Sequence, residues 1–343
     1  MQSSTNALIP FPIDSISQNQ TEYDPFKSFT AQSEQTFDNQ SAVFASLVNM
    51  TKDGCHFDDI LQDKAIMFLK CLEPGFGDTD TADRLISSLL LSSNEPNTAL
   101  NDSICILLSS PEKRIVSMTL TLLDSTTRRS SLQCRLQLLK SDLVHKMFAT
   151  IKPHTLPITE NDGIRSRMIW IAFHLLNLAN PNLLALLEIR NPSDKHNHLE
   201  MVFEKTVRPS SPFLHHAFKN HDLLPDRLKD SILNFFGAIL RLCPYFTPAL
   251  DFVIAHSVSL QTTRCLSFME DSRPLQNFLQ LTQMDFKNWA EGDWLVQRNG
   301  KIVGTALLSE GFKDEVEQLM MHDMSYVTNS ITQFTHFFGD NSA

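Results

Sequence analysis

The sequence predicts an all-α protein: a right-handed α-α superhelix of stacked helical repeats with a disordered polar arm at its N-terminus. The first observation is compositional, since 10 glycines against 16 prolines suit helices ended by proline better than a turn-rich β-sandwich. The second is periodicity, because apolar residues from Ser41 onward recur at spacings of three and four, the period of one helix face. The third is repetition. Helix starts at Asp142, Asp222 and Gly311 lie 80 and 89 residues apart, each about twice the ~40–47 residues of a helical repeat unit.

Three segments are expected along the 343 residues. Residues 1–38 form a polar arm, since they are rich in Ser, Thr, Gln and Asn and lack sustained helical periodicity, the composition of a segment that does not fold alone. Residues 39–322 form the helical repeat domain, and residues 323–343 form a C-terminal helix and tail. The length fits about two domains or one elongated array.

The clearest order of elements lies between residues 104 and 152. Ser110 is a good N-cap and Pro111 suits the first helical position, so we expect a helix to begin there. This helix carries two apolar stripes, which predicts a middle layer with neighbours on both sides. The stripes are Ile115, Met118 and Leu122, and Val116, Leu120 and Leu123. A second helix follows over 132–139, and a third begins after Ser141-Asp142 and ends before Pro153.

Further helices are expected along the rest of the chain. Residues 168–187 carry no charge, but Asn180-Pro181-Asn182 divides them into two pieces that are too short to span a membrane, so a buried helix followed by a turn is expected. Helices are also predicted over 225–242, 246–256 and 274–289. At 294–308 the Asn299-Gly300 pair is a hairpin signal, but its flanks favour a helix.

Charge and cysteine content narrow the class of protein. Acidic residues outnumber basic ones by 39 to 29, a net charge of −10, so no nucleic-acid partner is expected. The six cysteines are scattered without a C-x-x-C pair, which indicates buried thiols in a reducing compartment. We expect a cytoplasmic protein, with the nucleus as the alternative.

Three stretches together resemble an armadillo repeat: residues 107–112 (LLSSPE), 116–123 and 140–151. A short first helix, a longer second helix and a groove-lining third helix fall in that order over 104–152. From about residue 40 the chain also resembles a lineage-expanded group of armadillo-like proteins from anaerobic protists. The resemblance implies a fold and no function. The Trp-x-x-x-Asn ladders of nuclear-import armadillo proteins do not occur, since Trp170 stands seven residues before Asn177.

No catalytic or cofactor motif stands out. The chain has no G-x-S-x-G, no phosphate-binding G-x-x-x-x-G-K-[ST] and no kinase signature. Histidines gather between His196 and His221, but without the H-E-x-x-H or paired-cysteine spacing that holds zinc. A polar connecting surface is the simpler interpretation of this segment, and no cofactor and no metal are expected. The histidines are His196, His198, His215, His216 and His221.

These observations favour a non-enzymatic scaffold that binds a protein or peptide on the curved surface of a helical solenoid. In the best repeat the outward positions of the third helix are His145, Lys146 and Thr150, which we expect to contact the partner. The alternative is a helical metal-dependent hydrolase built around the histidines from His196 to His221, and a third hypothesis is an oligomerisation module.

Overall fold

The computed structural model describes residues 79–87, 102–153, 162–187, 189, 191–220, 223–267 and 294–309. Every regular element in these ranges is a helix, which confirms the all-α prediction. The helices are α4 (Thr79–Leu85), α5 (Asp102–Leu108), α6 (Lys113–Arg129), α7 (Leu132–Lys140), α8 (Leu143–Ile151), α9 (Gly163–Leu176), the 3₁₀ turn η4 (Asn177–Ala179), α10 (Pro181–Leu186), α11 (Pro192–Lys219), α12 (Asp226–Leu242), α13 (Thr247–Ala255), α14 (Val258–Ser267) and α16 (Trp294–Ser309).

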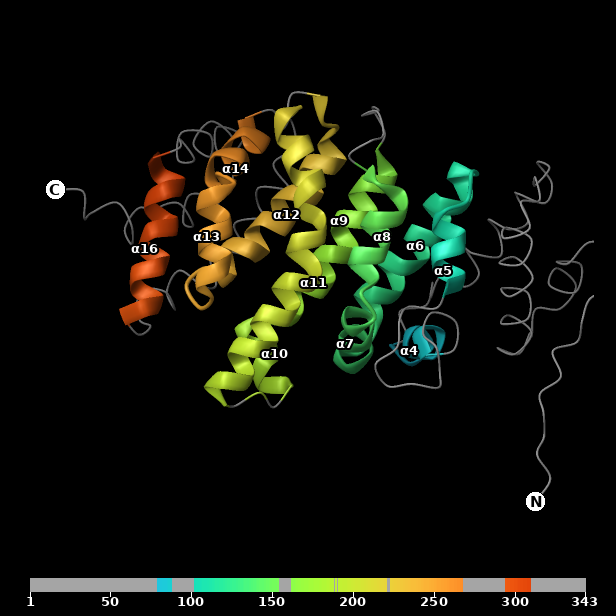
Figure 1. Ribbon diagram of the computed structural model, residues 1–343, viewed down its shortest axis with the longest axis horizontal. Helices are drawn as coiled ribbons and strands as arrows, with labels where there is room; N and C mark the ends of the chain where they lie inside the picture. The colour runs from blue at the N-terminus through green and yellow to red at the C-terminus, as the bar shows by residue number, and fades with distance from the viewer. Residues whose placement is uncertain are drawn as a thin grey trace, which may run out of the picture.

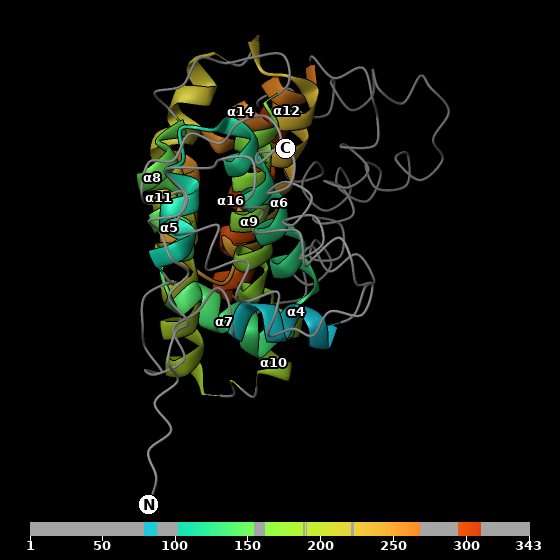
Figure 2. The ribbon, with the colours of Figure 1, turned by 90° about the vertical axis from the view of Figure 1, so that its right-hand side faces the viewer.

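The helices stack in a row of similar units (Figure 1). A long helix, a short helix and a third helix follow one another as α6–α7–α8, as α9–α10–α11 and as α12–α13–α14. The long helices form one layer, in which α9 packs between α6 and α12, and α5, α8 and α11 form the second layer. Seen along the row, α5, α8 and α11 lie on one side, α6 and α9 on the other, and α4, α7 and α10 at one end of both layers (Figure 2).

Helix α6 is buried on two sides, as its two apolar stripes predict. It packs against α4 and α5 on one side and against α9 on the other. Leu120 and Leu123 have no exposed surface, and only Met118 of the six stripe residues is partly exposed. The hydrophobic core therefore runs continuously between the layers.

The start of α6 differs from the prediction. The helix begins at Lys113 with Glu112 as its N-cap, two residues after the position that Ser110 would give. Residues 111 and 112 stay outside the helix, so Pro111 does not occupy its first position. Ser110 instead accepts a hydrogen bond from the backbone N–H of Glu112 through its Oγ, at 3.2 Å.

The start of α8 is where the sequence places it, but its cap works differently. Asp142 adopts a left-handed conformation (φ 59°) and makes no side-chain bond to the helix. Its carboxylate instead pairs with Lys205 of α11, with Nζ 2.9 Å from Oδ1. The same ammonium donates to the carbonyl of Lys140, at 3.1 Å. Lys205 therefore ties the turn between α7 and α8 to α11.

The later helices agree with the sequence. Residues 168–187 fall in α9, η4 and α10, and no helix of the described residues is long and apolar enough to cross a membrane. Helices α12 and α13 match the predictions for 225–242 and 246–256, and the residues around Asn299-Gly300 are helical. The predicted arm 1–38, the helix at 274–289 and the tail 323–343 lie outside the described residues, so the segment boundaries stay predictions.

Polar contacts join α9 to both of its neighbours in the long-helix layer. Arg167 donates through Nη1 to Ser117 Oγ of α6, at 3.1 Å. On the other side, Ser166 Oγ lies 2.6 Å from Ser231 Oγ of α12. These bonds are short and specific, so they fix how the long helices sit against one another.

Candidate functional site

Helix α11 is the longest described element, with 28 residues, and two prolines lie inside it. Proline has no backbone N–H, so Pro209 and Pro212 cannot donate to the carbonyls of Lys205 and Arg208, the residues four positions earlier. Ser210 adds to this local rearrangement, because its Oγ donates to the carbonyls of Thr206 and Val207, both at 2.9 Å. The middle of α11 therefore has two carbonyls whose usual helical N–H donors are absent.

A first cavity of about 820 Å³ lies between α8 and α11 at this point. Its wall is apolar, with Phe148 and Phe213 packed at a ring-centroid distance of 6.3 Å. Its rim is ionic, because Arg208 pairs with Glu204 at 2.7 Å. The lining residues are His145, Phe148, Ala149, Lys152, Glu204, Arg208, Pro209, Pro212 and Phe213.

A second cavity of about 590 Å³ lies between α11 and α13. It shares Arg208 and Pro212 with the first cavity, so the two adjoin across α11. Phe203 and Phe252 meet edge to face in its wall, at a ring-centroid distance of 5.8 Å. The lining residues are Phe203, Arg208, Ser211, Pro212, Pro248, Asp251, Phe252, Ala255 and His256.

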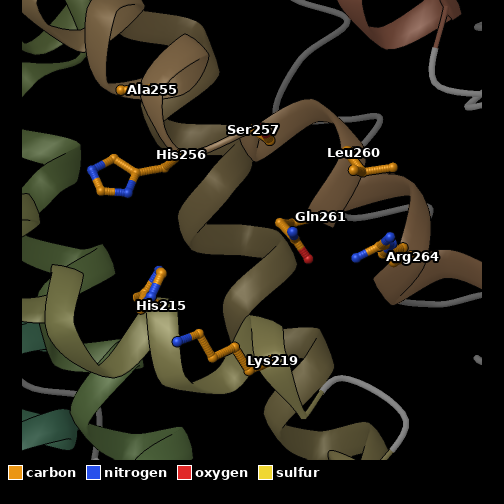
Figure 3. Close-up of a pocket in the computed structure, with 8 residues that line it drawn as sticks. All are labelled: His215, Lys219, Ala255, His256, Ser257, Leu260, Gln261 and Arg264. Carbon is orange, nitrogen blue, oxygen red and sulfur yellow. The ribbon is translucent and has the colours of Figure 1, made fainter.

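A third cavity of about 570 Å³ lies between the C-terminal end of α11 and α14 (Figure 3). It shares Ala255 and His256 with the second cavity. The three cavities therefore form one series from α8 across α11 to α14, which we call the α11 track. The third is lined by His215, Lys219, Ala255, His256, Ser257, Leu260, Gln261 and Arg264.

The side chains of the third cavity come from three helices. His215 and Lys219 stand one turn apart on α11, and Gln261 and Arg264 stand on one face of α14 (Figure 3). His256 follows α13, and its ring packs in a tilted arrangement on that of Phe252, with the ring centroids 4.3 Å apart. Burial, and next the nearby imidazole of His215, lower the pKa of His256 below its usual value.

The three predicted contact residues lie at different places on α8. His145 is exposed and lines the first cavity of the track. Lys146 and Thr150 are half-buried and do not belong to its lining. The structure brings Phe148 and Ala149 into the cavity beside His145 instead.

The histidine segment is a helix, so its interpretation as a polar connecting surface is wrong. Residues 196–216 lie on α11, whose inward face is apolar: Leu199, Val202, Phe203, Val207, Phe213, Leu214 and Ala217 are buried. At 1.5 Å per residue, His196 and His215 stand roughly 28 Å apart along the helix axis. His221 lies outside the described residues. Two ends of one helix cannot supply ligands to the same metal ion.

His198 has a structural role in this helix. Its Nε2 lies 3.0 Å from the carbonyl oxygen of Leu178, which joins α11 to η4. Burial is the main reason that the pKa of His198 falls below the usual value. Within the described part of the chain, no group of three or more His, Cys, Asp or Glu side chains could hold a metal ion.

Two of the described cysteines are unreactive thiols. Cys243 and Cys265 are buried, and burial raises the pKa of both, that of Cys265 to about 12. At neutral pH such thiols are protonated, so they are poor nucleophiles. Cys105 and Cys134 form no disulfide within the described residues.

Comparison with known proteins identifies the fold. No model of a known protein family matches the chain, and no curated protein matches it. A crystal structure of computationally designed armadillo repeat proteins for modular peptide recognition is similar, with a TM-score of 0.56 at 10% identity over 86% of this chain and 99% of that chain. This chain has the fold of an armadillo-like, right-handed helical solenoid. A second similar structure, an engineered protein, has a TM-score of 0.54 at 12% identity over 85% of this chain and 97% of that chain.

The α11 track could not be predicted from the sequence because the residues that line it are far apart in the chain. Its walls come from α8, α11, α13 and α14, between His145 and Arg264. One signal was present: Pro209 and Pro212 lie within an apolar pattern of helical period. Prolines that interrupt a helix without ending it often mark a place where the backbone has another partner.

Proposed function

We propose that this armadillo-like chain is a non-enzymatic scaffold that binds an extended peptide segment of a protein partner along the α11 track. The observation that carries this proposal is the continuity of the three cavities, which share Arg208 and Pro212, and then Ala255 and His256. A series of open cavities that crosses a helix fits a chain-like ligand better than a compact small molecule, which prefers one enclosed pocket.

The chemistry of the track also favours a peptide. Its walls hold apolar patches around Phe148 and Phe213, and around Phe203 and Phe252, which suit apolar side chains of a ligand. Arg208 lines both cavities, and its backbone carbonyl lacks the usual helical N–H donor because Pro212 has none. A peptide backbone supplies N–H groups at regular spacing, so it complements both features.

The structural comparison supports the same class of ligand. One of the similar solved structures is described as a protein for modular peptide recognition, and a stacked array of helical repeats presents an extended surface of this kind. For the present chain we assign the contact to α8 and α11, with Arg208 and Pro212 at the centre and His145 at one side. Lys146 and Thr150, which flank His145 on α8, stay predicted contacts.

The experiment is selection of a displayed library of random peptides on the full chain, followed by affinity measurements with the enriched peptides. Arg208→Glu and Pro212→Glu change exposed residues of two adjoining cavities, so we expect each to weaken binding by more than about tenfold, or about 1.4 kcal/mol. Lys113→Glu, at the exposed start of α6, makes the same charge change as Arg208→Glu away from the track and serves as the control.

Two outcomes contradict the proposal. Either no peptide is enriched, or the enriched peptides bind Arg208→Glu, Pro212→Glu and Lys113→Glu equally well. Lys146→Glu tests the remaining predicted contact separately, since unchanged affinity removes Lys146 from the binding surface while the track proposal stands on the other two variants. Residence in the cytoplasm and kinship with the armadillo-like protist proteins stay predictions, and no observation favours the hydrolase alternative.

A further inference from the structure

The third cavity of the α11 track differs from the other two in charge. The first cavity contains Glu204 paired with Arg208, and the lining of the second contains Asp251 as well as the same arginine. In the third cavity, the described lining residues include Lys219 and Arg264 but no carboxylate. The lining of the third cavity is therefore positively charged although the chain as a whole has a net charge of −10. This local charge differs from the average of the protein surface.

The cations of this cavity are not used in the fold. Lys219 and Arg264 are both exposed, and neither forms an ion pair within the described residues. By contrast, Lys205 is bound to Asp142 and Lys140, and Arg208 to Glu204. A basic side chain that has no structural partner and lines a cavity can pair with a ligand without first breaking a native contact.

Two imidazoles add hydrogen-bond donors to the two cations of the third cavity. His215 and His256 both line the cavity and lie on the side where the Lys219 side chain ends (Figure 3). Imidazole nitrogens donate hydrogen bonds to carboxylates in either charge state. The cavity therefore presents donors from α11, from the end of α13 and from α14 to one volume.

Gln261 points to a peptide rather than to a free anion. Its side-chain oxygen is buried and has no hydrogen-bond partner among the residues that the structure describes, and the residue lines the cavity. A carboxylate cannot donate a hydrogen bond to this oxygen, whereas a backbone N–H can. The cavity volume of about 570 Å³ likewise has room for several residues of an extended chain.

We propose that the α14 end of the track selects an acidic stretch of the bound peptide, with neighbouring Asp or Glu side chains paired to Lys219 and Arg264 and hydrogen-bonded to His215 and His256. The proposal rests on the proposed peptide-binding function and names the chemistry of its ligand. Carboxylates gain most where cations converge in a partly enclosed space, because charge-assisted hydrogen bonds are stronger there than in open water.

The test uses three labelled peptides that differ only in a central run of Glu, Gln or Lys, and fluorescence anisotropy with the full chain. We expect the Glu peptide to bind more than about tenfold tighter than the Gln peptide, a difference of at least about 1.4 kcal/mol, and the Lys peptide to bind more weakly than both. We also expect the advantage of the Glu peptide to shrink as salt is added, since exposed charges are screened.

Charge-reversal variants locate the effect. Lys219→Glu and Arg264→Glu are each expected to remove most of the difference in affinity between the Glu peptide and the Gln peptide. The affinity for the Gln peptide should stay the same. Lys301→Glu, at an exposed position of α16, makes the same change in net charge and is expected to keep that advantage. Thermal unfolding of each variant shows that the fold is intact, as expected for exposed positions.

The outcomes separate this inference from the proposed function. If library peptides bind in an Arg208-dependent way but Glu and Gln peptides bind equally, the acidic preference is wrong and the scaffold proposal stands. If Lys301→Glu weakens binding of the Glu peptide as much as Lys219→Glu does, the net charge of the chain explains the preference. The assignment of this preference to the third cavity is then wrong. A phosphoserine peptide that binds more than about tenfold tighter than the Glu peptide would replace carboxylate by phosphate as the selected group.

Discussion

The two sides of the helical array use polar residues in opposite ways. Around α9, polar side chains bind one another: Arg167 bonds to Ser117, and Ser166 meets Ser231. Along the α11 track, polar side chains surround cavities, and Lys219 and Arg264 have no ion-pair partner within the described residues. Both sides belong to the same stacked units, so helix packing alone does not decide which one is available to a ligand.

The difference shows where stability and binding are separated in this fold. Groups that satisfy one another hold the long helices together and offer little to a partner. Groups that line cavities add little to stability, because exposed charges without partners contribute almost nothing to folding. Substitutions on the α9 side should therefore change the free energy of unfolding, whereas those on the track should change peptide affinity.

The largest effect is expected from Leu120→Asp, because Leu120 is fully buried in α6, the helix that packs against α9 on one side and α5 on the other. A charged group without a partner in this core should cost more than about 3 kcal/mol and remove stability and peptide binding together. Chemical unfolding followed by circular dichroism measures it. Leu120→Met keeps the apolar volume and should cost less than about 1.5 kcal/mol. Equal unfolding midpoints for the two variants would contradict the assignment of Leu120 to a buried apolar stripe of α6.

The next effect is expected from Arg165→Met at the start of α9. Arg165 is buried, pairs with Asp162 and donates from Nε and Nη2 to the carbonyl of Pro153, at 2.9 and 2.8 Å. Its removal leaves the carboxylate of Asp162 buried without its cation, which should cost about 3 kcal/mol.

The double variant Asp162→Asn with Arg165→Met is the control for this prediction. Asparagine keeps a side-chain oxygen that can accept the N-cap bond from the backbone N–H of Arg165, but it carries no charge. The double variant should recover part of the lost free energy of unfolding. A double variant that is less stable than Arg165→Met would show that the buried charge is not the cause.

A smaller effect is expected from Asn177→Ala, between α9 and α12. Arg241 is buried and donates through Nη2 to Asn177 Oδ1, at 2.7 Å. Loss of this acceptor should cost about 2 kcal/mol, the range for a hydrogen bond to a charged group, and should leave peptide affinity unchanged. Asn197→Ala, at an exposed position of α11, should leave stability unchanged. A loss of peptide affinity in Asn177→Ala would contradict the claim that residues around α9 affect stability and not peptide binding.

The sequence predicted the elements better than the site. Apolar periodicity identified α6 and α12, and proline or Asn-Pro breaks located their neighbours, because burial of a helix face depends on nearby residues. The cap at Ser110 was wrong because its side chain accepts a hydrogen bond from the backbone N–H of Glu112, in the turn before α6, and the helix begins only at Lys113. The track could not be predicted, since the proximity of His215, His256 and Arg264 depends on how α11, α13 and α14 pack.

The smallest effect is a pH dependence of the free energy of unfolding. It tests whether His198 is one of the groups that stabilise the fold. Its pKa is lowered from the usual 6.5, mainly by burial, so the folded chain resists protonation of this imidazole while the unfolded chain does not. Above pH 6.5 both states are neutral at His198 and its contribution to stability is complete. As the pH falls below 6.5, the unfolded chain takes up the proton first, so this contribution is lost towards the lower pKa of the folded state.

His198→Gln isolates this effect, because glutamine can still donate to the carbonyl of Leu178 but does not titrate near neutral pH. The free energy of unfolding of the native chain should therefore fall more steeply between pH 7 and pH 5 than that of His198→Gln. The difference between the two slopes cannot exceed the value for uptake of one proton on unfolding. His145→Gln, on the exposed face of α8, should follow the native curve. Parallel curves for the native chain and His198→Gln would show that burial does not lower this pKa.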